Sequence, residues 1–410
     1  MKGIIFLFII SVLIIASTNN KQEETCNDGN STTCYNLAIK YYEEENYTMS
    51  IKLNTKACEK KHAYACKATA YFYKSNKWVK QDYAKYLYFS NKACEYGDGD
   101  ACLSLANEFM RDGNITKDIN RSIELYEESC KLKISNGCFM LGLLYDEGKT
   151  IEKDMQKAKE FYTKACDLNN SKGCRFLGLQ IFNEDNGTHN LLEVEKYTTK
   201  ACKLNDIEGC MLSAMLFVDK GGLQMDLKKA NIFLNKACDG NVSDACFRLG
   251  LMNENGNGIK NNYKKAFGFY TQACKSNDMR ACYNLANLYY HGKGVKQDYK
   301  MAQKYYEITD KNSFYQGTFT LGMMYMSGKG VIKNYSKAEK LFEKSCNNGY
   351  LKSCNNLAII YANGIGKDID YNKAYKLFNK ACDGGLEEAC KTAKVMQDNK
   401  KYDVNITKKK

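Results

Sequence analysis

The stretch that decides the fold covers residues 138–166 and reads CFMLGLLYDEGKTIEKDMQKAKEFYTKAC. Its first half has apolar residues at helical spacing, and Gly148 predicts where that helix ends. Its second half starts near Asp154, a predicted N-cap, and carries Ala158 and Tyr162 on one face. This stretch therefore predicts one unit of two antiparallel helices, each about a dozen residues long.

The same construction repeats along the chain, because cysteines recur in a fixed pattern. Twenty cysteines form ten Cys-x7-Cys pairs, and from Cys58 onward the pairs return every 36 residues. The first unit, Cys34 to Cys58, is four residues short. A fixed period of this size predicts a solenoid of helical hairpins. The chain has no proline to interrupt helices, and its thirty glycines supply turns.

One junction lacks its cysteines, since Asp310 and Thr318 stand where the period demands them. Both members are missing together, which is what direct bonding between the two partners would produce. Together with the export signal described below, this predicts a local disulfide within each pair. The predicted bridges are Cys26–Cys34, Cys58–Cys66, Cys94–Cys102, Cys130–Cys138, Cys166–Cys174, Cys202–Cys210, Cys238–Cys246, Cys274–Cys282, Cys346–Cys354 and Cys382–Cys390. Zinc sites favour closer cysteine spacing, often with histidine, so we predict no metal and no cofactor.

The N-terminus predicts export. Residues 1–17 read as a secretory signal, with Lys2 followed by an apolar stretch and small residues for cleavage. A retained N-terminal anchor is the alternative, but the apolar stretch is short for a membrane span. We therefore expect a periplasmic or secreted protein without stable membrane insertion. The formal charge of +13 is distributed through every repeat, so we predict no nucleic-acid partner, although a weak attraction to anionic envelope surfaces or acidic partners stays open.

Two positions on the first helix of each unit hold a recurring type of residue. Each cysteine pair, or the equivalent 310/318 pair, marks a junction between two units. The residue four places after the second member of each pair is always small, which predicts a close approach of helix backbones. These residues are Ala38, Ala70, Ala106, Gly142, Gly178, Ala214, Gly250, Ala286, Gly322 and Ala358. Tyrosine often stands one turn further along, and we expect it to fill space between units: Tyr41, Tyr73, Tyr145, Tyr289, Tyr325 and Tyr361.

These features resemble the Sel1-like repeat family, a branch of the tetratricopeptide-type helical hairpins. Residues 321–331 (LGMMYMSGKGV) and 335–346 (YSKAEKLFEKSC) carry the match. The chain is most similar to the cysteine-rich Helicobacter branch, over about residues 26 to 392. The resemblance implies a right-handed superhelix with a concave inner surface and exported proteins that interact with host or envelope components. It also implies a second function, because some members are described as penicillin-binding with weak β-lactamase activity.

The sequence contains no recognisable catalytic motif for that second function. Ser-x-x-Lys, Ser-Asp-Asn and Lys-Thr-Gly are all absent, and so is Gly-x-Ser-x-Gly. A zinc enzyme needs a histidine cluster, whereas only His62, His189 and His291 are present. The catalytic residues of a β-lactam hydrolase therefore stay unassigned, and whether the chain is an enzyme stays open.

Binding of a protein or peptide has more support in the sequence than catalysis, because the first helices carry suitable residues. Positions on each first helix are counted from the second cysteine position of the preceding pair. We expect the residues at positions three, four and seven to form the core. Those at positions two, five and six should face the concave side. In the C-terminal half, the residue at position two gives a polar series, Arg248, Asn284, Thr320 and Asn356, whereas the middle of the chain is apolar at Met140, Phe176 and Leu212. Asn and Arg side chains can bind the backbone or carboxylate of an extended peptide. An ordinary solvated helix surface is the alternative.

The sequence thus predicts an all-α fold, an α/α solenoid of disulfide-stapled hairpins. We expect a signal peptide at 1–17, a short segment at 18–25, a solenoid of ten hairpins at 26–390, and a capping helix with a basic tail at 391–410. The predicted function is binding of a protein or peptide along the concave surface. The alternative is a penicillin-binding protein that weakly hydrolyses β-lactams.

Overall fold

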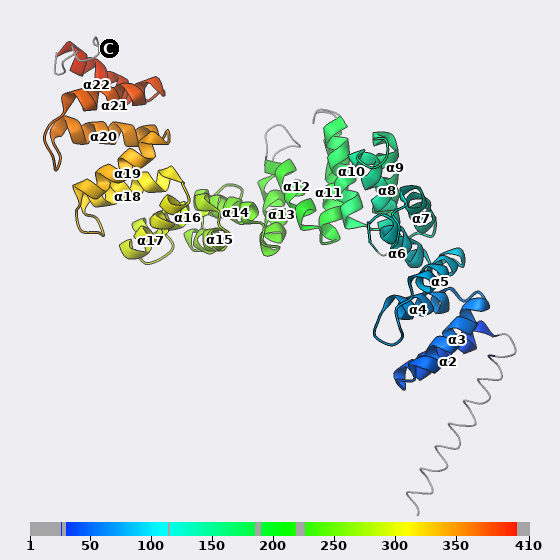
Figure 1. Ribbon diagram of the computed structural model, residues 1–410. Helices are drawn as coiled ribbons and strands as arrows, with labels where there is room; N and C mark the ends of the chain where they lie inside the picture. Colours follow the sequence, from blue (N-terminus) through cyan, green and yellow to red (C-terminus); the bar gives the residue numbers. More distant parts are fainter. Residues whose placement is uncertain (1–25, 27–29, 114, 185–189, 219–225, 400–410) are drawn as a thin grey trace, which may run out of the picture. The chain divides into compact units, whose positions relative to one another are not determined.

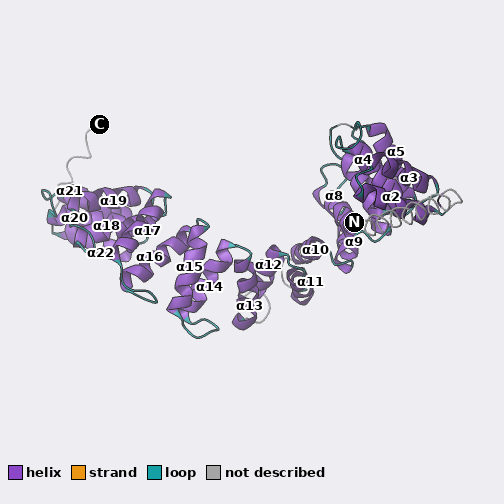
Figure 2. Ribbon diagram, turned by 90° about the horizontal axis from the view of Figure 1, so that it is seen from below, coloured by secondary structure: helices purple, strands orange, loops and turns teal. Residues whose placement is uncertain are grey.

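The computed structural model describes residues 26, 30–113, 115–184, 190–218 and 226–399, and these form helices and loops without a strand (Figures 1 and 2). The all-α prediction is therefore confirmed for the described part of the chain. The predicted signal peptide, the segment 18–25 and the last eleven residues lie outside it. None of the described helices is long and apolar enough to cross a membrane.

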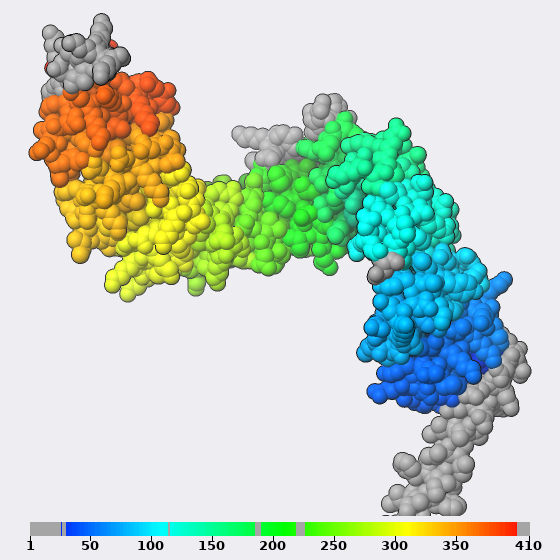
Figure 3. Space-filling model, in the orientation of Figure 1, coloured from blue at the N-terminus to red at the C-terminus, as the bar shows by residue number. Residues whose placement is uncertain are grey.

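The chain divides into two compact units, residues 1–209 (unit 1) and 210–410 (unit 2). Within each unit, consecutive hairpins stack directly on one another (Figure 3). Unit 1 contains α2 (Ser31–Glu43), α3 (Tyr47–Glu59), α4 (Ala63–Lys74), α5 (Tyr83–Glu95), α6 (Gly99–Phe109), α7 (Ile119–Lys131), α8 (Ser135–Glu147), α9 (Met155–Asp167), α10 (Ser171–Glu184) and α11 (Leu191–Lys203). The division falls within α12 (Ile207–Val218). Unit 2 continues with α13 (Leu227–Asp239), α14 (Ser243–Asn255), α15 (Tyr263–Lys275), α16 (Met279–His291), α17 (Tyr299–Lys311), α18 (Tyr315–Ser327), α19 (Tyr335–Asn347), α20 (Leu351–Asn363), α21 (Tyr371–Asp383) and α22 (Glu387–Asp398).

Helices α2 to α21 form the ten predicted hairpins, each of a first helix and a second helix. The predicted local signals set their ends: Gly148 ends α8 in the left-handed conformation, and the Asp154 side chain accepts from the Lys157 N–H at the start of α9. The short first hairpin has a simple cause. Three residues separate α2 from α3, whereas seven, 256–262, separate α14 from α15.

The ends of neighbouring hairpins are joined by disulfides between a second helix and the next first helix. Nine of the predicted pairs are bonded in this way, with Cα–Cα distances between 4.5 and 4.8 Å. Cys202 and Cys210 are disulfide-bonded as well. At the ten junctions from Cys58 onward, the third residue after the first position has positive φ: Lys61, Gly97, Lys133, Asn169, Asn205, Asn241, Asn277, Ser313, Gly349 and Gly385. The repeated turn therefore requires a left-handed residue between the two cysteine positions.

The small residues on the first helices lie against the second helix of the same hairpin. A Cβ at Gly142 would lie 2.5 Å from the ring of Tyr162, and one at Gly322 would lie 2.7 Å from the ring of Phe342. Tyr162 and Phe342 are fully buried. At these two positions the small residue therefore makes room for a buried aromatic ring.

The tyrosines one turn beyond the small residues contact two hairpins. Tyr289 stacks on Tyr305 of its own hairpin at 5.8 Å and lies 5.3 Å from the ring of Phe267 in the preceding hairpin. The Tyr325 hydroxyl accepts from Gln303 of the preceding hairpin at 3.1 Å. The prediction that the tyrosines fill space between units is therefore confirmed for Tyr289 and Tyr325.

One prediction about the first-helix faces is wrong. The residue six after the second junction position is buried in most hairpins: Phe72, Gln180, Leu216, Met252, Leu288, Met324 and Ile360. A neighbouring hairpin contributes to this burial, since the Gln180 amide donates to the Met155 carbonyl of the preceding hairpin at 2.6 Å, and the periodicity of one helix cannot reveal such a contact.

The predicted capping helix begins earlier than residue 391. Helix α22 starts at Glu387, so Cys390 lies in its first turn and bonds Cys382. The other described first helices likewise hold the second junction position in the first turn, and α22 therefore occupies the place of a first helix.

Candidate functional site

The predicted partner-binding residues occupy one position on four successive first helices of unit 2. We call Arg248 on α14, Asn284 on α16, Thr320 on α18 and Asn356 on α20 the first-helix ladder. All four side chains are half-buried. The 36-residue period places them in the same register, since each follows the second junction position by two residues.

Arg248 belongs to a charge network at the base of α14. Its Nε donates to Asp244 Oδ2 at 2.7 Å, and Arg280 donates to the other oxygen of Asp244 at 2.8 Å and to Asp278. Burial raises the pKa of Asp244, but the hydrogen bonds from Arg248 and Arg280 outweigh it and hold the pKa below its ordinary value. The Arg248 guanidinium is therefore oriented by a carboxylate, which leaves its outer N–H groups for a ligand.

The other three ladder residues also have neighbours within the unit. Asn284 interacts with the Tyr270 hydroxyl, and Thr320 donates to the Gln316 carbonyl at 3.0 Å. The Asn356 amide donates to Met323 Sδ at 3.1 Å, a contact that joins α20 to α18. A weak sulfur acceptor is easily exchanged for a carbonyl oxygen, so Asn356 can change partner at little cost.

Two further rows extend the ladder into a continuous surface, the first-helix face. The row five after the second junction position is half-buried and mostly apolar: Leu251, Asn287, Met323 and Ile359. The row nine after it is exposed and polar: Asn255, His291, Ser327 and Asn363. Residues two, five and nine lie on one side of a helix. The face thus consists of parallel rows along the stack of hairpins, with a mostly apolar row between two polar rows.

The apolar middle series behaves differently from the ladder. Phe176 packs against Tyr162 and Phe139, with ring centroids 5.5 and 5.6 Å apart. The Arg175 guanidinium lies over the Phe176 ring and pairs with Asp206 and Glu208. Phe176 is therefore part of the packing of unit 1.

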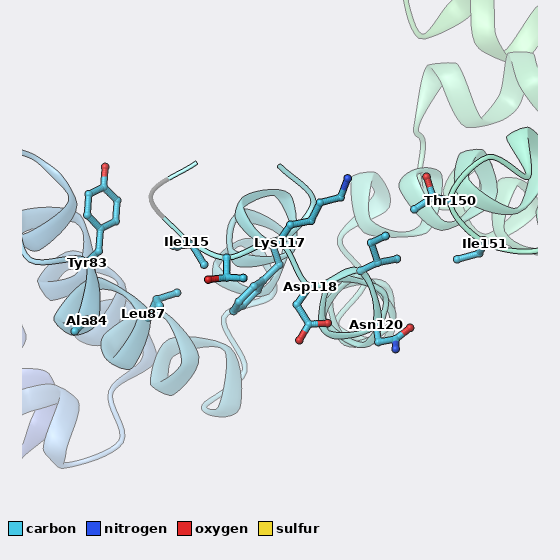
Figure 4. A pocket seen from close by; sticks show the side chains of 12 residues that line it. Tyr83, Ala84, Leu87, Ile115, Lys117, Asp118, Asn120, Thr150 and Ile151 are labelled. Carbon is cyan, nitrogen blue, oxygen red and sulfur yellow. The ribbon is translucent and has the colours of Figure 1, made fainter. Parts of the chain in front are cut away.

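A cleft of about 930 Å³ lies on unit 1, away from the predicted site (Figure 4). Side chains of α5 and α7 and of the loops before α7 and α9 line it, including Leu87, Ile115, Ile119 and Ile151. Its charged residues are Lys117 and Asp118, and the Asp118 carboxylate caps α7. The cleft is mainly apolar, and its only carboxylate already has a structural role.

Sequence reasoning also missed an aromatic cluster at the start of unit 1. The Trp78 ring lies 5.5 to 5.9 Å from the rings of Tyr42, Tyr47, Tyr71 and Phe72. The single tryptophan in a loop near several tyrosines was the available signal. These rings cover the end of the first two hairpins.

The described residues do not assemble a metal centre. No group of three His, Cys, Asp or Glu side chains within them could hold a metal ion. His62 caps α4 by accepting from the Ala65 N–H at 3.2 Å, and His291 is the last residue of α16. Burial, followed by the charges of Lys293 and Lys329, lowers the pKa of His291. His189 lies outside the described residues.

The fold and the first-helix face define the class of protein: a helical-repeat scaffold. The Sel1 repeat profile matches residues 99–133, 135–170, 210–242, 243–278, 280–308, 318–350 and 351–386. These matches cover more than half of the chain, and the chain belongs to the Sel1 repeat family. The predicted family resemblance is thereby confirmed. A search of curated protein sequences finds no match.

Two solved structures agree with this fold, and a third is similar in sequence over part of the chain. A protective antigen of uropathogenic Escherichia coli, c5321, has 20% identity and a TM-score of 0.65, with 94% of this chain and 91% of that chain covered. A Sel1 repeat protein from Oxalobacter formigenes has 22% identity and a TM-score of 0.58, covering 77% and 91%. Cysteine-rich protein B of Helicobacter pylori is 34% identical over 34% of this chain and all of its own, with a TM-score of 0.28.

Proposed function

We propose that this chain is an exported protein-interaction scaffold that holds an extended protein or peptide segment along the first-helix face of unit 2. The observation that carries the proposal is the ladder itself. Arg248, Asn284 and Asn356 repeat in register, and half-buried apolar residues lie beside them. An extended peptide offers backbone amides and side chains at regular intervals, so this alternation suits it.

Export rests on the cysteines. All twenty are disulfide-bonded, and no free cysteine occurs among the described residues. Disulfides at this density persist in oxidising compartments such as the periplasm or the cell exterior. Thiol labelling of the native protein directly after cell lysis should therefore detect no reactive cysteine.

The partner-binding test uses the oxidised chain from residue 18 onward. Proteins captured from envelope and host-cell extracts are identified, and the affinity of each purified partner is measured by calorimetry. The ladder variant Asn284→Ala, Thr320→Ala, Asn356→Ala should weaken binding at least about tenfold, since each lost hydrogen bond contributes about 1 kcal/mol.

The matched control places three alanines on the second helices. Lys304, Lys340 and Lys376 are exposed and share one register on α17, α19 and α21. Replacing them should leave the affinity unchanged. Equal affinity of the ladder variant and the wild type would contradict the proposed face, and an equal loss in both variants would place the partner elsewhere.

A further inference from the structure

Unit 2 separates its charges between its two ends. The loop edge comprises the loops from the first to the second helices and the adjoining first turns, residues 256–265, 292–301, 328–337 and 364–373. It carries eleven lysines and three aspartates. The junction edge, residues 238–246, 274–282, 310–318, 346–354 and 382–390, carries four basic and seven acidic residues. Basic residues that are spread evenly along the sequence are therefore concentrated at one end of every hairpin.

The lysines of the loop edge have almost no carboxylate partners. Within the described part of unit 2, only Lys367 among the eleven forms an ion pair, with Glu339. At the junction edge, Asp244, Asp278 and Asp310 are all ion-paired. The positive charge of the loop edge is therefore not neutralised within the unit and is available to a partner.

The positive charge at the start of each second helix is unfavourable for the helix itself. The first turns of α15, α17, α19 and α21 contain lysine and no acidic residue. A cation at a helix N-terminus opposes the helix dipole and weakens the helix slightly. The helix dipole thus gives no reason for lysine at these positions, although Lys337 and Lys373 each donate to a tyrosine hydroxyl of their own hairpin at 2.6 Å, Tyr325 and Tyr361.

Neighbouring loops touch, so the edge is continuous. A Cβ at Gly294 would collide with the backbone of Tyr263, and one at Gly366 would lie 2.7 Å from Tyr335 Cβ. Lys329 places its ammonium 5.6 Å from the ring centroid of Tyr299 in the preceding hairpin. The loops α14–α15, α16–α17, α18–α19 and α20–α21 therefore form one row along unit 2 (Figure 1).

Apolar side chains project from the same row. Ile332 is 91% exposed between Lys329 and Lys333, and Ile369 is 54% exposed in the next loop. Tyrosine is the first residue of all four second helices there: Tyr263, Tyr299, Tyr335 and Tyr371. Lysines beside exposed aliphatic residues match the charged headgroups and shallow acyl boundary of a membrane.

The loop edge is less suited to binding nucleic acid than to binding a membrane surface. Single strands bind by stacking bases on open aromatic rings. Here Lys293 lies over the Tyr263 ring, Lys329 lies over the Tyr299 ring, and glycine loops pack against both residues. The exposed aliphatic side chains favour a lipid surface.

We propose that the loop edge of unit 2 docks the protein peripherally on a membrane surface that contains anionic lipid. Lysines contact the headgroups, and Ile332 and Ile369 enter the interface. Because the loop edge and the first-helix face are different surfaces, this docking does not depend on the proposed partner binding.

The experiment measures co-sedimentation of the oxidised chain from residue 18 onward with vesicles. Vesicles of phosphatidylcholine with about one third phosphatidylglycerol should bind the wild type, and pure phosphatidylcholine should not. Binding should weaken steeply as salt rises, because exposed charges are screened. The loop-edge variant Lys260→Glu, Lys296→Glu, Lys333→Glu should reduce partitioning by more than about tenfold.

The control variant Lys304→Glu, Lys340→Glu, Lys376→Glu has the same net charge but alters only the second helices. It should reduce partitioning less than about threefold. A separate Ile332→Ser variant should reduce partitioning about threefold to tenfold without changing the salt dependence. Absence of wild-type binding to the anionic vesicles, equal losses in the two charge variants, or binding to single-stranded RNA in place of vesicles would each overturn the proposal.

Discussion

The junction between α15 and α16 is closed by the Cys274–Cys282 disulfide, whereas the next junction, between α17 and α18, has Asp310 and Thr318 at the same positions. The turns are nevertheless alike. Asn277 and Ser313 have φ of 63° and 60°. The next residue in each turn donates to the carbonyl five residues earlier, in Ala273 at 3.1 Å and in Thr309 at 2.9 Å. Both second helices thus end in the same left-handed motif.

A hydrogen bond stands in place of the missing disulfide. Thr318 Oγ1 donates to Asp310 Oδ1 at 2.8 Å, and Lys344 from α19 donates to the same oxygen at 2.7 Å. In two other hairpins the equivalent residue donates to a cysteine carbonyl, Lys200 to Cys166 at 2.7 Å and Gln272 to Cys238 at 2.9 Å. The difference teaches that helix packing and the turn determine the shape of a junction. A disulfide adds stability mainly by restricting the unfolded chain.

Removing the Cys274–Cys282 disulfide should change the stability of the protein more than any other substitution at these two junctions. Cys274→Ser with Cys282→Ser should lower the free energy of unfolding by about 2–3 kcal/mol, the value for so short a closed loop. Hydrogen exchange should accelerate in α15 and α16 more than in α20 and α21, because repeats interact with their neighbours. Replacing the pair by Asp and Thr should recover about 1 kcal/mol of the loss. No change in exchange would show that the bridge is dispensable.

Adding a methyl group at Gly317, in the unbridged junction, should lower stability nearly as much. A Cβ at Gly317 would collide with buried Thr309, whereas the equivalent positions of the bridged junction hold two buried alanines, Ala281 and Ala273. Gly317→Ala should therefore destabilise unit 2 by about 1–3 kcal/mol in denaturant titrations. Adding Thr309→Ala should restore most of that stability, since it reproduces the alanine pair of the bridged junction. Additive effects of the two substitutions would contradict the proposed collision.

Building the missing bridge should have a smaller, positive effect. Asp310→Cys with Thr318→Cys should oxidise without loss of helicity, because the backbone already matches the bridged junction. The gain should be about 1–2 kcal/mol, which is the loop-closure contribution less the lost hydrogen bond and ion pair. Denaturation with and without reductant measures it. Free thiols after oxidation would mean that the two junctions differ in geometry.

The turn residue should give the smallest effect. Ser313 is left-handed, a conformation that asparagine tolerates better than serine. Ser313→Asn should stabilise the unbridged junction by about 0.5 kcal/mol, and Asn277→Ser should destabilise the bridged one by the same amount. Thermal unfolding of the two variants checks this reciprocity, and shifts of the same sign would contradict it.

Much of the fold could be predicted from the sequence because its signals are local. The 36-residue period, the Gly148 helix end and the Asp154 N-cap all depend on residues within one hairpin, and the structure contains them as expected. The left-handed turn position could also have been found, since Asn or Gly occupies most of its ten occurrences. Lysine at two of them obscured the pattern.

The candidate site could be predicted only in part. The register of Arg248, Asn284, Thr320 and Asn356 follows from the period, but their half-buried state and their partners do not. Asp244 and Arg280, which orient the charges around Arg248, come from two successive hairpins. Their mutual distance depends on how the hairpins stack.

The sequence by itself determined the helical class, the hairpin unit, the helix ends and which cysteines could be joined, because each is fixed by contacts within a few turns of chain. The tertiary structure alone decided which helix faces stay in water. Residues such as Leu288 and Ile360 are buried, although helical periodicity places them away from the core. Stacking also gathered evenly spaced lysines into one edge of unit 2. Helical periodicity defines the direction of a side chain, but only packing against a neighbouring hairpin decides what that side chain meets.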